Sequence, residues 1–312
     1  MRHRAYEKIA GPGTRLDGDL GGPWVALEKV HGAQLVVAVA GDDVRFGKRK
    51  AWLADDDPFF GWQLVRAELT EGARAAAALA GAPVVVLYGE LFGGGYPHPD
   101  VAPVPGLQPV QTGVWYAPDL RWAVFDVVVA TDEDDPGERL AFGEVRPLAA
   151  EAGLLVPPTI RAGRRTEVEA TAERFPTAVP GQLGLPAIEG NLAEGLVLRR
   201  DARARPGEAV TYKRKIDEFA EDRFGEAEAW DADQRPDLDA LCGWARRLTN
   251  PARVAGAASK WGRHDVAAVL DEVELDVLID LAEAFPAVAR TPSEADEVAL
   301  RAAIREAAAA LL

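Results

Sequence analysis

The strand-like segments in the first two thirds of the chain constrain its fold most, because they follow one another in hairpins. QLVVAVA (34–40) and VRFGKRK (44–50) flank GDD, a plain hairpin turn. Similar segments, rich in Val, Leu and aromatic residues, are WVALEKV (24–30), PVVVLYGELFG (83–93), RWAVFDVVVA (121–130), EGLVLRR (194–200) and AVTYKRK (209–215). Helical spacing appears at 59–80 and at 138–153, where Pro147 interrupts it. Strands in hairpin runs, without strict alternation with helices, predict an α+β fold.

The last third of the chain changes to helical spacing. Its apolar residues recur with that spacing in LDALCGWARRLTN, HDVAAVLDEVELDVLIDLAEAF and SEADEVALRAAIREAAAALL. TPSEADE is a capping pattern before the last helix, and Asn250 with Pro251 closes an earlier one. We predict a strand-rich domain over residues 1–225 and a small all-helical C-terminal domain over 226–312, joined through DADQRPD (231–237).

Length, cysteine content and the lack of targeting signals indicate what holds the fold together and in which compartment the protein works. A chain of 312 residues is long enough to bury two cores without disulfide or metal staples. Cys242 is the single cysteine, and the four histidines show no clustered zinc-ligand spacing. The N-terminal residues lack the apolar region of a signal peptide, and no run is long and apolar enough for a membrane span. We expect a cytoplasmic protein with no membrane partner.

The net charge of -15 argues against a polyanionic partner, but the basic residues are unevenly distributed. Residues 29–50 hold five basic residues against two acidic ones, a net of +3. Residues 199–215 hold seven against two, a net of +5. These two positive islands indicate a focused site for an anion, and the alternative is a pair of solvated loops.

Five of the seven lysines fall in the positive islands, although the chain has 28 arginines. An ammonium can lose its proton and become a nucleophile, which a guanidinium effectively cannot. Lys29 ends an apolar segment three residues before Gly32, where an amine could sit in a partly dry pocket. Lys213 and Lys215 alternate on a strand and project to one face, and their charge nearby would lower the pKa of Lys29. The alternative is an edge-strand lysine that reaches into water.

Six motifs in a fixed order carry a family resemblance. They are EKVHG (28–32), GKRK (47–50), YGELFG (88–93), WAVFDVV (122–128), AEGLVLR (193–199) and YKRK (212–215). The series resembles that of covalent nucleotidyltransferases, the polynucleotide ligases and mRNA capping enzymes, and its wording is similar to the RNA ligase 2 family, which includes the RNA-editing ligases. The tail stretch LTNPARVAGAASKWG is similar to an element of that family's helical C-terminal domain. The resemblance implies an antiparallel-sheet nucleotidyltransferase domain, ATP-grasp-like, followed by helices.

The resemblance also implies a role for each motif residue. Lys29 would attack the α-phosphorus of ATP and hold AMP through a phosphoramide bond. His31 would serve later steps, and Glu194 would place a divalent metal ion, Mg²⁺ or Mn²⁺, and orient the lysine. Lys213 and Lys215 would neutralise the α-phosphate and the leaving pyrophosphate. The nucleotide would further contact Glu28, Arg49, Glu90 and Phe125. Glu90 would accept a hydrogen bond from a ribose hydroxyl, and Phe125 would stack on adenine.

The implied function is an ATP-dependent RNA ligase for RNA repair. It would join 3'-hydroxyl and 5'-phosphate RNA ends through a lysyl-adenylate and an adenylylated RNA end, with RNA-repair proteins as possible partners. One alternative is a DNA ligase or capping enzyme, but those relatives place a strand-rich domain after the paired lysines. Others are a non-catalytic nucleotide or RNA-end binding protein and a generic acidic scaffold. The sequence leaves open whether the substrate is a nicked duplex, a broken tRNA or a mixed RNA and DNA end.

Overall fold

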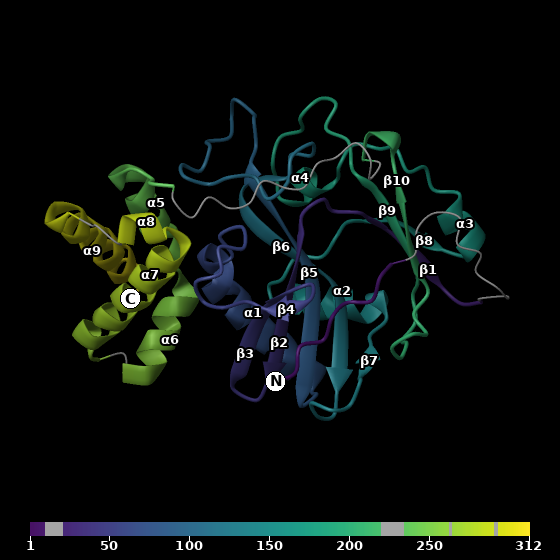
Figure 1. Cartoon of the computed structure of the whole chain (residues 1–312), viewed down its shortest axis with the longest axis horizontal. Coiled ribbons are helices and arrows are strands. Elements are labelled where there is room, and N and C mark those ends of the chain that lie inside the picture. The colour runs from purple at the N-terminus through teal and green to yellow at the C-terminus, as the bar shows by residue number, and fades with distance from the viewer. Residues whose placement is uncertain (10–20, 220–233, 262–263, 290–292) are drawn as a thin grey trace. The chain divides into compact units, whose positions relative to one another are not determined.

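The computed structural model describes residues 1–9, 21–219, 234–261, 264–289 and 293–312 (Figure 1). The chain forms two compact units. The strand unit comprises Met1–Leu53, Gly72–Ala102 and Pro109–Glu228, and the helical unit comprises Ala54–Glu71, Pro103–Gln108 and Ala229–Leu312. The predicted boundary between residues 225 and 226, and residues 231–233 of the predicted linker, lie outside the described ranges. That boundary therefore stays a prediction.

The larger sheet of the strand unit is built from hairpins. Its strand order is β4-β3-β2-β5-β6-β7, and the ladders between these strands are antiparallel. The strands are β2 (Ala33–Ala40), β3 (Asp43–Lys48), β4 (Ala51–Trp52), β5 (Val84–Gly95), β6 (Ala117–Ala130) and β7 (Glu138–Arg139). Alternate residues face opposite sides of a strand, and Val36 and Val37, which face opposite sides of β2, are both fully buried. The centre of this sheet is thus covered on both faces.

The smaller sheet carries the ends of the motif series. Its strand order is β10-β9-β1-β8, again with antiparallel ladders, formed by β1 (Trp24–Glu28), β8 (Thr159–Gly163), β9 (Gly195–Arg200) and β10 (Thr211–Lys215). Trp24, Leu196 and Leu198 pack in its core with Val168 of α3 (Arg165–Glu169). Because β9 pairs with both β1 and β10, residues near Lys29, Glu194 and Lys215 come together at one end of this sheet.

Short helices and the N-terminal segment complete the strand unit. The helices are α2 (Phe142–Glu151), α4 (Val179–Gln182) and the 3-10 turn η1 (Asp217–Phe219), and α1 (Gln63–Ala80) has its C-terminal half here. Residues 1–9 form no helix or strand but lie along the larger sheet. His3 Nε2 lies 2.9 Å from the Lys48 carbonyl oxygen, and Trp52 Nε1 donates to the Met1 carbonyl at 3.2 Å.

The helical unit contains α5 (Leu238–Leu248), α6 (Pro251–Trp261), α7 (Val266–Ala284), α8 (Pro286–Ala289) and α9 (Glu294–Ala309). The Ser293 hydroxyl accepts a hydrogen bond from the Asp296 amide at 3.1 Å, so the capping pattern before the last helix is confirmed. Asn250, which we expected to close a helix, also caps the start of α6, because its side chain accepts a hydrogen bond from the Arg253 amide at 2.9 Å. No helix within the described ranges is long and apolar enough to cross a membrane.

The structure confirms the α+β class with antiparallel sheets followed by helices, and it corrects three details. The segment 138–153 is not helical throughout, because Glu138 and Arg139 pair with β6 as β7 and the helix begins at Phe142. Pro147 lies inside α2 without ending it. The third detail is β8, which we did not predict from the sequence. This strand lies at the edge of its sheet and has mostly exposed side chains, so it lacks the apolar pattern that marks a buried strand.

Candidate active site

Lys29 lies at the end of β1 and contacts a buried carboxylate. Its Nζ donates to Glu194 Oε2 at 2.6 Å. Glu194, directly before β9, has a side chain that is only 1 % exposed, whereas the Lys29 side chain is 19 % exposed. The Lys29 side chain is therefore partly exposed, whereas the carboxylate that holds its amine is buried.

Two further basic side chains meet the same carboxylate. Lys215 Nζ on β10 lies 2.9 Å from Glu194 Oε1, and His31 Nδ1 lies 3.4 Å from Glu194 Oε2. The His31 amide donates to the Tyr116 hydroxyl at 2.9 Å, and the His31 ring packs edge-on against Phe219 at 5.2 Å between centroids. The structure thus brings four predicted residues into one cluster: Lys29, His31, Glu194 and Lys215.

Glu194 is held in the ionised form by its neighbours. Burial by itself would raise the pKa of this carboxyl, but the charge of Lys29 and the hydrogen bond and charge of His31 outweigh it, so the pKa lies well below its usual range. A carboxylate in this state is a poor base. Its contact with Lys29 agrees with the predicted orienting role, and its charge also balances two ammonium groups, which the sequence argument from like charges did not include.

Two glycines allow the strands around this cluster to approach closely. A Cβ on Gly32 would lie 2.1 Å from the Leu91 carbonyl oxygen, and a Cβ on Gly195 would lie 2.1 Å from the Arg214 carbonyl oxygen. Real side chains cannot come so near to backbone atoms. The contact between the turn after Lys29 and β5 therefore requires a glycine at position 32 of the EKVHG motif.

A cavity of about 120 Å³ lies beside Lys29 and has a mixed lining. Lys29 and Glu90 are among its charged residues, as are Asp126 and Arg199, and its aromatic side chains are Phe125 and Tyr6. Burial raises the pKa of Glu90 to about 7, while the charge of Lys29 acts in the opposite direction. A ligand that joins a flat aromatic group to a charged group fits this mixed lining.

Glu28 also lines the cavity, but its carboxylate is turned to the start of α4. It accepts from Thr177 Oγ1 at 2.5 Å and from the Ala178 amide at 2.8 Å. The residue is 1 % exposed, and burial raises the pKa of its carboxyl to about 7. The structure therefore gives Glu28 a link to α4 that the sequence did not suggest, and its contact with a nucleotide stays a prediction.

Two other predicted residues lie further from the cluster. Arg49 is exposed in the turn between β3 and β4 and does not line the cavity. Lys213 is on β10, where it pairs with Val197 of β9. It lies two residues from Lys215 and on the same side of the strand. Their roles toward a phosphate stay predictions.

Sequence reasoning missed a group of residues that line the cavity around Phe125. Tyr6 donates from its hydroxyl to Asp126, and Arg199 pairs with the same carboxylate, which is fully buried. Gln34 lies opposite Glu90 in the sheet and lines the cavity, and its buried Nε2 finds no hydrogen-bond partner among the residues that the structure describes. An acceptor on a bound molecule would satisfy that amide. Gln34 lies on β2, the strand that directly follows the EKVHG motif, and that position could have drawn attention to it.

The cluster does not form a metal cage by itself. Within the described part of the chain, no group of three His, Cys, Asp or Glu side chains is placed to hold an ion. Both oxygens of Glu194 already contact cationic side chains. A divalent ion would fit here only with phosphate oxygens and water as most of its ligands, an arrangement that is common for Mg²⁺.

Comparison with known protein families agrees with the motif series. A family model described as RNA ligase matches residues 22–215, which is more than half of the chain. This range includes the Lys29 cluster and both sheets of the strand unit.

Curated relatives match over the same part of the chain. The chain is 31 % identical to the mitochondrial RNA-editing ligase 2 of Trypanosoma brucei brucei over 208 residues, covering 59 % of this chain and 50 % of that protein. It is 32 % identical over 219 residues to the mitochondrial RNA-editing ligase 1 of the same organism, covering 59 % of this chain and 46 % of that one. The chain thus spans about half the length of the curated relatives it matches.

Solved structures of a Naegleria gruberi RNA ligase are also similar. A mutant with ATP and Mn matches with a TM-score of 0.41 and 14 % identity, over 64 % of this chain and 51 % of that one. The same ligase with PPi matches with a TM-score of 0.41 and 15 % identity, over 65 % and 52 %.

Proposed function

Because this chain belongs to the RNA ligase family, we propose that it is an ATP-dependent RNA ligase that joins 3'-hydroxyl and 5'-phosphate RNA ends. One observation carries the proposal: Lys29, Lys215 and His31 converge on the single buried carboxylate of Glu194, and Lys29 also lines a cavity that Phe125 and Tyr6 share. A nucleophilic amine, phosphate-binding cations and a place for a base are the parts that covalent nucleotidyl transfer requires.

In the first step, Lys29 Nζ attacks the α-phosphorus of ATP. An N–P bond forms, the bond from the α-phosphorus to the bridging oxygen breaks, and pyrophosphate leaves. The proton of Lys29 passes to water, because Glu194 is too weak a base and the Lys29 side chain is partly exposed. Lys215 and Lys213 stabilise negative charge on the α-phosphate and the leaving group.

Two further transfers complete the reaction. An oxygen of the RNA 5'-phosphate attacks the phosphorus of the lysyl-adenylate, so that the N–P bond breaks and Lys29 regains a proton. The 3'-hydroxyl of the other RNA end then attacks the 5'-phosphate phosphorus, and AMP leaves. We propose that His31 acts in these later steps, and its contact with the carboxylate that holds Lys29 supports this.

A divalent ion, Mg²⁺ or Mn²⁺, would be held by the nucleotide phosphates together with Glu194, and would neutralise developing charge on the phosphates. We further propose a cytoplasmic location, RNA repair as the setting and RNA-repair proteins as partners. These three points rest on the sequence expectations and on the family.

The test of the proposed function is covalent labelling. The protein is incubated with α-labelled ATP, α-labelled GTP or adenylate-labelled NAD and with magnesium or manganese, and the denatured polypeptide is examined for label. We expect label from ATP alone, and its loss in Lys29→Ala. Lys50→Ala is the matched control, because Lys50 is an exposed lysine of the same positive island and should keep the label.

Each outcome decides between functions. Label from GTP would indicate capping chemistry, and the absence of label from all three nucleotides would favour a binding protein. Label retained in Lys29→Ala would remove Lys29 from the mechanism. If ATP labels the protein, a nicked duplex with a labelled 5'-phosphate should then yield an adenylylated end and a sealed product.

A further inference from the structure

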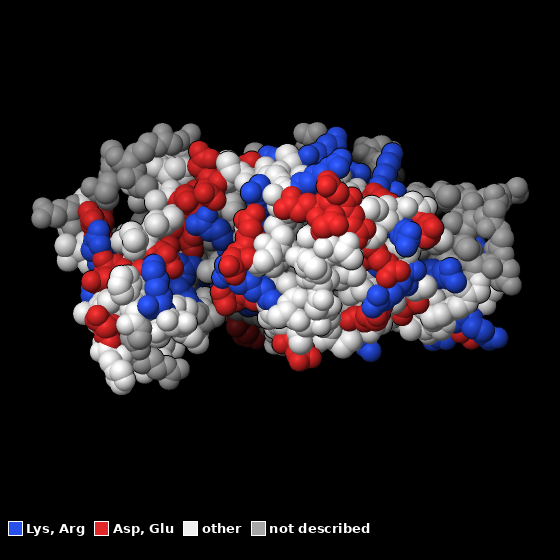
Figure 2. All heavy atoms as spheres, turned by 90° about the horizontal axis from the view of Figure 1, so that it is seen from below, with Lys and Arg blue, Asp and Glu red and all other residues white. Residues whose placement is uncertain are grey.

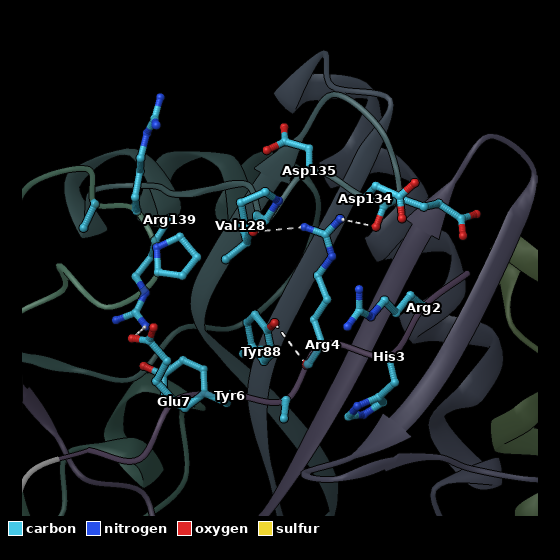
Figure 3. A pocket seen from close by; sticks show the side chains of 16 residues that line it. Arg2, His3, Arg4, Tyr6, Glu7, Tyr88, Val128, Asp134, Asp135 and Arg139 are labelled. Atoms are coloured by element: carbon cyan, nitrogen blue, oxygen red, sulfur yellow. Dashed lines mark hydrogen bonds and ion pairs between the residues drawn. The ribbon is translucent and has the colours of Figure 1, made fainter.

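A second cavity lies on the other side of Tyr6 from the cavity of Lys29. It has a volume of about 330 Å³ and is lined by the N-terminal segment, by Tyr88 and Arg139, and by residues 133–136 and 204–206 (Figure 3). Among the described residues, Tyr6 alone lines both cavities. The phenol ring is therefore the partition between them.

The partition adjoins the other aromatic side chain of the smaller cavity. The Tyr6 ring packs edge-on against Phe125, with 5.1 Å between centroids, and Lys29, whose ammonium contacts Glu194, lines the same cavity. Phosphates would be drawn to the Lys29 ammonium, and the flat base of a nucleotide would stack at the aromatic side chains. The base would thus point its far edge toward Tyr6.

The ring is held rigidly in this place. Its hydroxyl donates to Asp126, whose charge is balanced by Arg199 and by Arg139 at 3.5 Å. Tyr88 packs on the ring at 5.0 Å, and the Arg139 guanidinium lies over it at 5.1 Å. Burial raises the pKa of Tyr6 well above its usual value, so the hydroxyl keeps its proton and its hydrogen bond.

The segment that carries Tyr6 is also anchored on both sides of the ring. The Arg4 guanidinium donates to the carbonyl oxygens of Asp132 and Pro136 at 3.1 and 3.2 Å, and Tyr88 donates to the Arg4 carbonyl oxygen at 3.1 Å. Figure 3 shows Arg4 between Tyr88 and the loop of Asp134 and Asp135. On the other side, Glu7 accepts from the Gly207 amide at 2.6 Å. A wall fixed in this way cannot easily yield to a larger ligand.

We propose that Tyr6 determines specificity by limiting the size of the base that the nucleotide cavity accepts, and that removing its ring opens the site to adenine nucleotides with bulky substituents on the base. This inference rests on the proposed function, because it takes the smaller cavity as the ATP site. The second cavity would supply the room that the substituent needs.

The experiment compares ATP with three analogues that carry a benzyl group on N6, a bulky group on C2 or a bulky group on C8. Covalent labelling of the full chain is measured with each nucleotide for wild type and for Tyr6→Ala, and the rate with each analogue is divided by the rate with ATP. We expect this ratio to rise in Tyr6→Ala by about tenfold or more for at least one analogue. Tyr6→Phe keeps the ring and should keep the wild-type ratios.

The ratio separates a specificity role from a merely structural one, since a loosened fold would slow ATP and analogues alike. If Tyr6→Ala does not fold by circular dichroism, Tyr6→Leu takes its place, because leucine keeps apolar contact but removes the ring and hydroxyl. Ratios unchanged for all three analogues in a folded variant, or a wild type that already uses all three as fast as ATP, would overturn the inference. Failure of wild type to be labelled by ATP would instead contradict the proposed function.

Discussion

Glu28 and Lys29 are neighbours in the chain, but their side chains have different partners. Lys29 contacts Glu194, while the Glu28 carboxylate accepts hydrogen bonds at the start of α4. The cost of burying the charge of Glu28 is only partly offset by these two bonds, because the pKa of this carboxyl is raised from 4.5 to about 7. The nucleophile therefore follows a residue whose ionisation changes near neutral pH.

The raised pKa of Glu28 predicts a pH dependence of stability. Between pH 4.5 and about 7 the folded state keeps the proton while the unfolded state releases it, so the free energy of unfolding falls as the pH rises through this window. Glu28→Gln has no proton to lose. Urea denaturation at pH 5 and at pH 8 measures the loss of unfolding free energy between these two values. This loss should be smaller in Glu28→Gln than in wild type, by at least about 1 kcal/mol.

The matched control is Glu189→Gln, which removes an exposed carboxylate and should leave the wild-type profile unchanged. Part of the pH dependence should persist in Glu28→Gln, because the pKa of Glu90 is also raised to about 7. Parallel profiles for wild type and Glu28→Gln would show that Glu28 does not titrate in this window.

Among the elements, the helices of the helical unit are tied together by buried ion pairs. Asp280 on α7 pairs with Arg66 of α1 and with Arg253 of α6, and both the Asp280 and the Arg253 side chains are at most 5 % exposed. Removing the carboxylate would leave a buried guanidinium without its counter-charge. We predict that Asp280→Ala lowers the free energy of unfolding by about 3–5 kcal/mol.

Asp271 provides the control for this prediction, because it lies on the same helix and also pairs with an arginine, Arg305 of α9, but its side chain is 66 % exposed. Asp271→Ala should cost less than about 1 kcal/mol. Urea unfolding followed by far-ultraviolet circular dichroism would measure both variants. Equal losses for the two variants would contradict the assignment of stability to burial.

Regular elements were predictable wherever a sequence pattern marks them. The hairpin of β2 and β3 combines apolar runs with a turn, and the last helix begins at its capping serine. The edge strand β8 and the two-residue β7 carry no such pattern, since one presents mostly exposed side chains and the other is too short. Their positions are determined by the strands beside them.

The residues of the candidate site also divide into those that a sequence pattern marks and those that it does not. Lys29, His31, Glu194 and Lys215 were identified from motif order, and the structure places them in contact. Tyr6 could not be identified, because residues 1–9 form no regular element and reach the cavity only through tertiary contacts with the larger sheet. Nor could pattern alone reveal that the Gly32 backbone must approach Leu91 so closely.

For the whole molecule, the structure alters the meaning of the second positive island. Arg199 is buried against Asp126, Arg203 pairs with Glu138 and Glu144, and Arg214 donates to backbone carbonyls. On the face drawn in Figure 2, basic and acidic side chains are intermixed. Part of the positive charge that the sequence predicts for an anionic partner, that of Arg199 and Arg203, is therefore already neutralised within the fold.

This neutralisation predicts a weak but measurable salt dependence of RNA binding, given the proposed function. Arg49 and Lys50 are exposed, and Lys213 and Lys215 belong to the proposed site, so about four phosphate contacts with a duplex would give a slope of log affinity against log salt of about -3.5. Arg49→Ala should reduce the magnitude of that slope by about 1. Arg203→Ala should leave it unchanged, because the charge of Arg203 is already paired with two carboxylates. Binding of a nicked RNA duplex at several salt concentrations, measured for wild type and both variants, provides the slopes. A slope that Arg203→Ala lowers as much as Arg49→Ala would mean that RNA displaces those carboxylates, and a flat wild-type response would mean that recognition does not depend on the basic residues at all.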